Sequence, residues 1–99
     1  MLNIQKKQDN STLTIILSGR LDSSTSSQLE TTINESINQI DYLILDMKDL
    51  DYISSAGIRV LISTQKKLNE SQKFVIKNVC EEIQEIFDIT GLSSMLNIE

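Results

Sequence analysis

The chain has 99 residues, of which 39% are hydrophobic and 4% aromatic, and it contains no histidine, no proline, no tryptophan and a single cysteine. The length fits one domain, and isoleucine and leucine supply most of the apolar side chains, so we expect an aliphatic core. The lack of histidine excludes the commonest general base and every zinc site with an imidazole ligand. A single cysteine excludes an internal disulfide and a cysteine cluster, so we expect no metal and no cofactor.

Nine basic residues against fourteen acidic ones give a net charge of −5. The basic residues are scattered and have no aromatic residues between them, which argues against a nucleic-acid partner. No apolar stretch approaches the roughly 20 residues that a membrane-spanning helix needs. The first residues also lack the charged and apolar segments of a signal peptide. We therefore expect a cytoplasmic protein without a membrane partner.

Two segments near the start of the chain, residues 2–7 and 13–17, alternate apolar and polar side chains as strands do. The polar residues 9–11 between them are typical of a turn. We therefore expect an N-terminal hairpin whose second strand is closed by Gly19.

A first helix is predicted from caps among residues 22–24 to an apolar stripe that ends at Ile40. The continuous apolar run at residues 42–45 is typical of a strand covered on both faces. Residues 49–53 are interpreted as a connecting segment.

A second helix is predicted to start near Ser55, and residues 74–76 are predicted to form the next strand. Residues 81–90 have helical spacing and acids in the first turn, and Gly91 is a typical left-handed cap. Residues 95–98 are interpreted as a short last strand. The order β-β-α-β-α-β-α-β predicts an α/β fold with a mixed sheet, in which helices cover at least one face and give parallel neighbours.

The candidate functional segment is the helix start at Ser54, Ser55, Ala56 and Gly57. Two hydroxyls are followed there by the only alanine of the chain and one of its three glycines. Small residues leave the first turn accessible, and the unpaired N–H groups of a helix N-terminus tolerate a phosphate on a hydroxyl. Capping by the serines and close packing by the small residues would explain the same pattern without any binding function.

The sequence around this segment resembles the STAS domain, as found in bacterial anti-sigma factor antagonists. Residues 51–61 resemble the family signature, and residues 17–22 resemble its Gly-x-Leu-Asp turn before the first helix. Residues 86–92 resemble its C-terminal helix end. The resemblance runs from about residue 2 to residue 98 and implies that residues 1–99 form one STAS domain.

The resemblance implies a non-enzymatic protein that switches partners. Such an antagonist binds an anti-sigma factor, itself a serine kinase, and thereby frees a sigma factor to join RNA polymerase. The kinase phosphorylates the antagonist on a serine at the start of the second helix, and the complex dissociates. A serine phosphatase reverses the modification.

The family pattern at this helix start is commonly Asp-Ser-Ser/Thr-Gly. When its glycine is aligned on Gly57, the phosphoacceptor is Ser55, Ser54 stands at the acidic position, and Ala56 stands at the Ser/Thr position. When the serine pair is aligned instead, the phosphoacceptor is Ser54. We prefer Ser55, because the following Gly-Ile-Arg-Val-Leu then runs in register with the family helix. The partner-binding residues that the resemblance implies are Asp22, Ser54, Ser55, Ala56, Gly57, Arg59 and Ser63.

Two other functions compete with this interpretation. Because Ser54 replaces the family's aspartate, the chain could be a constitutive structural or regulatory subunit of a lipid-transport or signalling assembly. An enzyme or a nucleotide-binding domain is disfavoured, because the chain has no glycine-rich phosphate loop followed by lysine.

Other polar residues have simpler explanations. Residues 23–27 could form a second phosphorylation patch, but helix capping explains them. Cys80 is interpreted as a small filler of the core. Four acids that could meet at one edge of the sheet, as in phospho-receiver domains, are interpreted mainly as cap and turn residues. They are Asp22, Asp46, Asp49 and Asp51.

Overall fold

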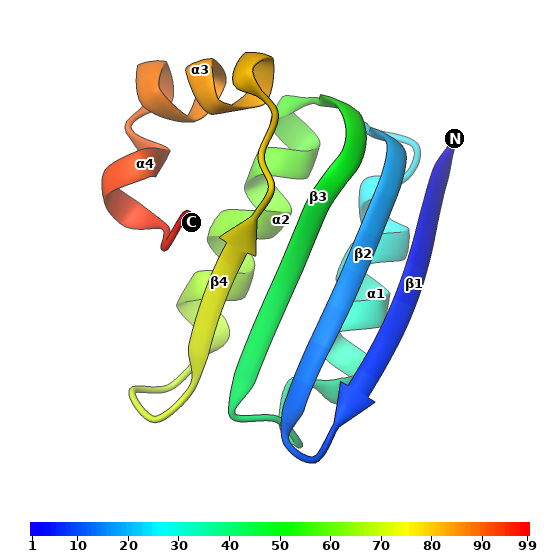
Figure 1. Ribbon diagram of the computed structural model, residues 1–99, viewed down its shortest axis with the longest axis vertical. Coiled ribbons are helices and arrows are strands. Elements are labelled where there is room, and N and C mark those ends of the chain that lie inside the picture. The colour runs from blue at the N-terminus through cyan, green and yellow to red at the C-terminus, as the bar shows by residue number, and fades with distance from the viewer.

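The computed structural model, which describes residues 1–99, has one mixed four-stranded sheet in the order β1-β2-β3-β4 (Figure 1). The strands are β1 (Leu2–Asp9), β2 (Thr12–Leu21), β3 (Tyr42–Ile53) and β4 (Lys73–Lys77). The helices are α1 (Ser26–Ser36), α2 (Ser55–Lys67), α3 (Glu81–Thr90) and α4 (Leu92–Met95). No helix has the length and apolar character needed to cross a membrane.

The pairing of the strands follows from the connections between them. β1 and β2 are antiparallel and form the expected hairpin, with Asn10 in the left-handed region at its turn (φ 57°). β3 is parallel to both β2 and β4, because α1 and α2 carry the chain back along the sheet before each new strand begins. The α/β class and the mixed sheet are therefore confirmed.

The core lies between the sheet and the two long helices, which both lie behind the sheet in Figure 1. Along β2, Leu13, Ile15 and Leu17 are fully buried, whereas Thr14 and Ile16 are half-buried. The helices therefore cover one face, and the opposite face of the strands has no helix over it.

β3 is longer than the sequence predicts. Residues 49–53 are not a connecting segment, because the strand continues through them to Ile53. The prediction that both faces of residues 42–45 are covered is also wrong, since Ile44 is only half-buried. Likewise, Gly19 does not end β2, which runs two residues further.

The physical reason for these errors is an irregularity in the pairing of β2 with β3. The register shifts between Ile16 and Ser18 and again between Gly19 and Arg20. As a result, buried residues recur along β3 first at every second position and then at every third. A strict two-residue alternation, which is the usual signal of a strand, stops where the shifts begin.

The ends of the helices show two more differences. α1 ends at Ser36, so Ile37 and Ile40 are buried in the turn after the helix and not on it. α3 has the predicted bounds, and Gly91 ends it in the left-handed region (φ 80°).

The last segment is mainly helical. The predicted strand at residues 95–98 is reduced to one parallel bridge between Ile98 and Ile76. Leu92, which is 3% exposed, packs into the core from the short helix α4 that precedes this bridge.

Candidate functional site

The predicted helix start lies where β3 passes into α2, at the upper edge of the sheet in Figure 1. A single residue, Ser54, separates the strand from the helix. Its N–H donates to the carbonyl oxygen of Leu21 at 2.9 Å, and its hydroxyl oxygen accepts the N–H of Gly57 at 3.4 Å. Ser54 therefore caps α2 and also fixes the helix start to the end of β2.

Gly57 lies in the first turn of α2 but faces the core and is buried. A Cβ atom at this position would lie 2.8 Å from Cγ of Leu21 and 2.9 Å from Cγ1 of Ile53. Glycine thus allows α2 to approach the ends of β2 and β3. Gly57 supports the predicted surface from beneath and does not lie on it.

Ser55 is the first residue of α2 and is exposed. Its hydroxyl has no hydrogen-bond partner in the chain, unlike that of Ser54. Ala56, which follows, is half-buried. The partial positive charge of the helix N-terminus favours an anionic group at this position.

Asp22 lies directly after the β2 residue that binds Ser54. Its carboxylate accepts the hydroxyl of Ser24 at 2.8 Å and the N–H groups of Ser24 and Thr25 at 3.0 and 3.2 Å. These bonds, led by the one from the Ser24 hydroxyl, hold the pKa of Asp22 below its ordinary value, although burial acts in the opposite direction. The carboxylate is therefore charged at neutral pH and belongs to the turn that precedes α1.

Arg20 connects this turn to the end of β3. Its Nε atom lies 3.7 Å from Oδ2 of Asp22, and its guanidinium stacks 4.1 Å from the ring centre of Tyr52. Tyr52 is 40% exposed. An aromatic ring and two charges of opposite sign therefore lie beside the start of α2.

A hollow of about 210 Å³ opens between α1 and α2 next to Ala56. The other residues that line it are Ser26, Ser27, Glu30, Arg59 and Val60. Arg59 is exposed and forms no ion pair. The sequence gives no sign that Ser26, Ser27 and Glu30 lie beside Ala56, since only the packing of α1 against α2 brings them here; the two serines belong to residues 23–27, whose pattern alone is explained by helix capping.

The other predicted residues lie apart from this hollow or take part in local structure. Ser63 is half-buried two turns further along α2. Asp46 accepts the amide of Asn78 at 2.9 Å, and Cys80 is half-buried at the cap of α3. No three histidine, cysteine, aspartate or glutamate side chains come close enough to hold a metal ion.

Comparison with known proteins identifies the class. The family model described as STAS domain matches residues 3–99, and the chain belongs to the STAS domain family. The anti-sigma-B factor antagonist of Bacillus subtilis (strain 168) is 26% identical over 98 residues, which cover 98% of this chain and 90% of the relative.

Two solved structures share the fold. An anti-sigma factor antagonist from Mycobacterium paratuberculosis superposes with a TM-score of 0.91 at 19% identity, over 99% of this chain and 85% of the other. The Bacillus cell fate determinant SpoIIAA, in its phosphorylated form, gives a TM-score of 0.78 at 19% identity, over 98% and 91%.

Proposed function

We propose that this STAS domain is an anti-sigma factor antagonist that binds an anti-sigma factor with serine kinase activity and thereby releases a sigma factor. The proposal is supported by the named activity of the Bacillus subtilis relative, which aligns over nearly the whole chain. Because sigma factors act on RNA polymerase, the exchange belongs in the cytoplasm. The protein performs no catalysis itself, and its chemistry is done by its partners.

The observation that carries the proposal is the contrast between the two serines at the start of α2. The Ser54 hydroxyl is engaged by the N–H of Gly57, whereas the Ser55 hydroxyl is exposed and unbonded. A kinase needs an accessible hydroxyl, which supports Ser55 as the phosphoacceptor and Ser54 as the cap. Ser54 remains the alternative acceptor.

The surface around Ser55 explains how phosphorylation would act as a switch. A phosphate adds about −1.5 to −2 charges at neutral pH. In the free protein the helix N-terminus stabilises this charge, and Arg59 follows at the i+4 position of the same helix. In a complex the same charge would be buried against the partner, where an unpaired charge costs several kcal/mol. Phosphorylation therefore favours dissociation without unfolding, and a serine phosphatase restores binding.

The proposed contact surface combines the Asp22 turn, the start of α2 and the hollow between the helices. Arg59 presents a free positive charge, and Asp22 presents a carboxylate held by its own turn. Charges held in this way set orientation and partner choice more than total affinity. Ser63 extends the surface along α2.

The test is to mix the protein with the anti-sigma factor kinase of the same organism and ATP, and to locate phosphate by mass spectrometry. We expect one phosphate on Ser55, and none after Ser55→Ala. Ser71→Ala is the matched control, because it removes an exposed hydroxyl from the loop after α2, outside the proposed contact surface, and should leave phosphorylation intact. Binding without phosphate on either Ser54 or Ser55 would favour a constitutive subunit, and absence of both binding and phosphate would reject the proposal.

A further inference from the structure

The outer edge of β4 is only partly paired. At Ile76 the N–H donates to the carbonyl oxygen of Asn97 at 2.9 Å, and the carbonyl accepts the N–H of Glu99 at 2.8 Å. Both backbone groups of Ile76 therefore point away from β3 and toward the C-terminal segment. Because backbone direction alternates along a strand, the N–H and carbonyl of Phe74 point the same way.

The backbone groups of Phe74 have no partner in the chain. The bonds that the C-terminal segment makes to β4 both involve Ile76, and Phe74 takes part in no turn, loop or cap bond. Yet Phe74 is only 3% exposed. Buried backbone groups are nearly always hydrogen-bonded, so this unpaired pair indicates a place that a donor and an acceptor of another molecule can fill.

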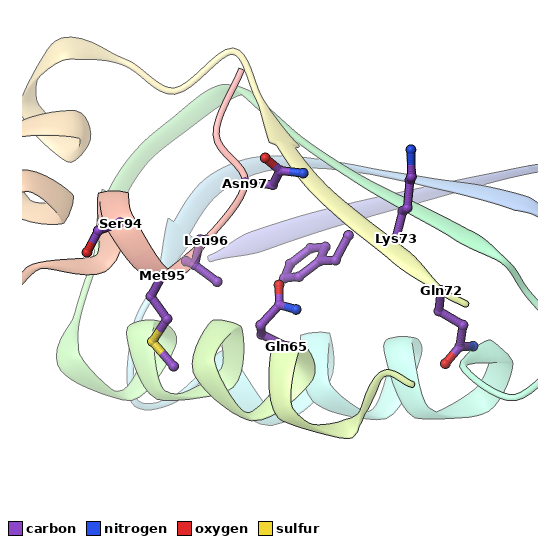
Figure 2. Close-up of a pocket in the computed structure, with 8 residues that line it drawn as sticks. Gln65, Gln72, Lys73, Ser94, Met95, Leu96 and Asn97 are labelled. Carbon is purple, nitrogen blue, oxygen red and sulfur yellow. The ribbon is translucent and has the colours of Figure 1, made fainter. Parts of the chain in front are cut away.

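A cavity of about 320 Å³ lies at this point, where the C-terminal segment diverges from β4. Figure 2 shows Gln65 of α2 reaching toward β4 from one side, with Asn97 and Lys73 on the other. Gln72 also lines the cavity, but its amide nitrogen already donates to the carbonyls of Ile37 and Ile40, both at 2.7 Å. The side-chain amides of Gln65 and Asn97 have no such bonds and are available to a ligand.

We propose that this cavity binds an extended peptide segment of a partner protein, which pairs with β4 at Phe74 and places an acidic side chain beside Lys73. Addition of a strand to a sheet edge satisfies the free N–H and carbonyl, and free side-chain amides at the rim can bond the next peptide groups. The charge preference follows from Lys73, which is exposed and forms no ion pair. The volume is at the lower end of known ligand pockets, so a short segment fits.

This site is separate from the proposed phosphorylation site. Gln65 follows Ser55 by ten residues on α2, which is about 15 Å along the helix axis. Peptide binding at β4 therefore does not depend on the function proposed for Ser55, and either proposal can fail alone.

The test is an NMR titration of the isotope-labelled protein with a capped pentapeptide of alternating valine and glutamate. We expect chemical-shift changes at Phe74, Gln65 and Asn97, and we expect exchange of the Phe74 amide hydrogen to slow by about tenfold at saturation. Lys73→Glu should weaken binding by about tenfold, whereas Lys7→Glu on the far strand should not. A peptide with glutamine in place of glutamate should bind more weakly than the acidic one.

Two results would overturn the proposal. The first is a Phe74 amide that is already as protected as that of Ile76 in the free protein, because the C-terminal segment would then pair with β4 itself. The second is the absence of shift changes around the cavity at millimolar peptide, with the spectrum of a folded protein as the internal control.

Discussion

Ser54 and Ser55 are adjacent in the chain, but only the hydroxyl of Ser54 is bonded within it, to the N–H of Gly57. We therefore expect Ser54→Ala to lower the free energy of unfolding by about 0.5–1 kcal/mol, the lower part of the range for lost caps, since the bond is 3.4 Å long. Ser55→Ala should change it by less than about 0.5 kcal/mol. Urea denaturation of the three proteins checks the difference, and equal losses in both variants would contradict it.

A negative charge at Ser55 should weaken partner binding and leave the fold intact. We expect Ser55→Asp to reduce affinity for the anti-sigma factor at least tenfold, or about 1.4 kcal/mol, because the carboxylate would be buried in the interface. Calorimetric titration measures the affinity, and circular dichroism checks the fold.

The control for this experiment is Asn38→Asp, which introduces the same charge at an exposed position after the far end of α1. Unchanged binding of Ser55→Asp would reject Ser55 as the controlling position. Equal weakening by both variants would instead indicate a general effect of net charge.

Replacement of Gly57 by alanine should destabilise the protein even though alanine favours helices. A Cβ atom would meet Leu21 and Ile53 at 2.8 and 2.9 Å, inside their side chains and not at flexible ends. Overpacking of this kind costs about 1–3 kcal/mol, and the gain in helix propensity of about 1 kcal/mol offsets part of it. We expect the urea midpoint of Gly57→Ala to be lower than that of the wild type. Lys66→Ala, on the exposed face of α2, is the control and should leave the midpoint unchanged. A Gly57→Ala variant more stable than the wild type would show that α2 can shift away from Leu21 and Ile53.

The turn at Asp22 should give the protein a component of acid sensitivity. Hydrogen bonds from Ser24 and Thr25 lower the pKa of Asp22 in the folded state. The stability they contribute is therefore fully present above the unfolded value of about 3.9 and is lost as the pH falls through the folded pKa. Asp22→Asn should be less stable than wild type at pH 7, and the gap should shrink toward pH 2.5.

Thermal denaturation at a series of pH values measures that gap. Asp88, whose pKa is also lowered, by Ser93 and Gln84, is present in both proteins, so its contribution cancels in the comparison. A gap between wild type and variant that is the same at every pH would show that the charge of Asp22 plays no part.

Where residues close together in the chain determine the structure, the sequence alone is enough to predict it. The bounds of α3 follow from the spacing of Ile83 and Phe87 and from Gly91, which needs no neighbour to adopt a left-handed conformation. The role of Ser54 as a cap is likewise local.

Features that depend on pairing between distant segments could not be predicted. The continuation of β3 to Ile53 depends on register shifts against β2, which replace the two-residue alternation of a strand with a three-residue spacing that does not indicate a strand. The hollow beside Arg59 forms only because α1 brings Ser26 and Glu30 next to α2. The edge of β4 at Phe74 is unpaired only because the C-terminal segment diverges from the strand there. In each case the decisive contact joins residues far apart in the chain.

The one-residue connection between β3 and α2 has a consequence for signalling. Because β3 ends at Ile53 and α2 starts at Ser55, no flexible linker separates the strand from the helix. A chemical change at Ser55 therefore does not act through a hinge between β3 and α2. We expect a partner to detect such a change only by direct contact with Ser55, so the specificity of the response is set by the surface of that partner.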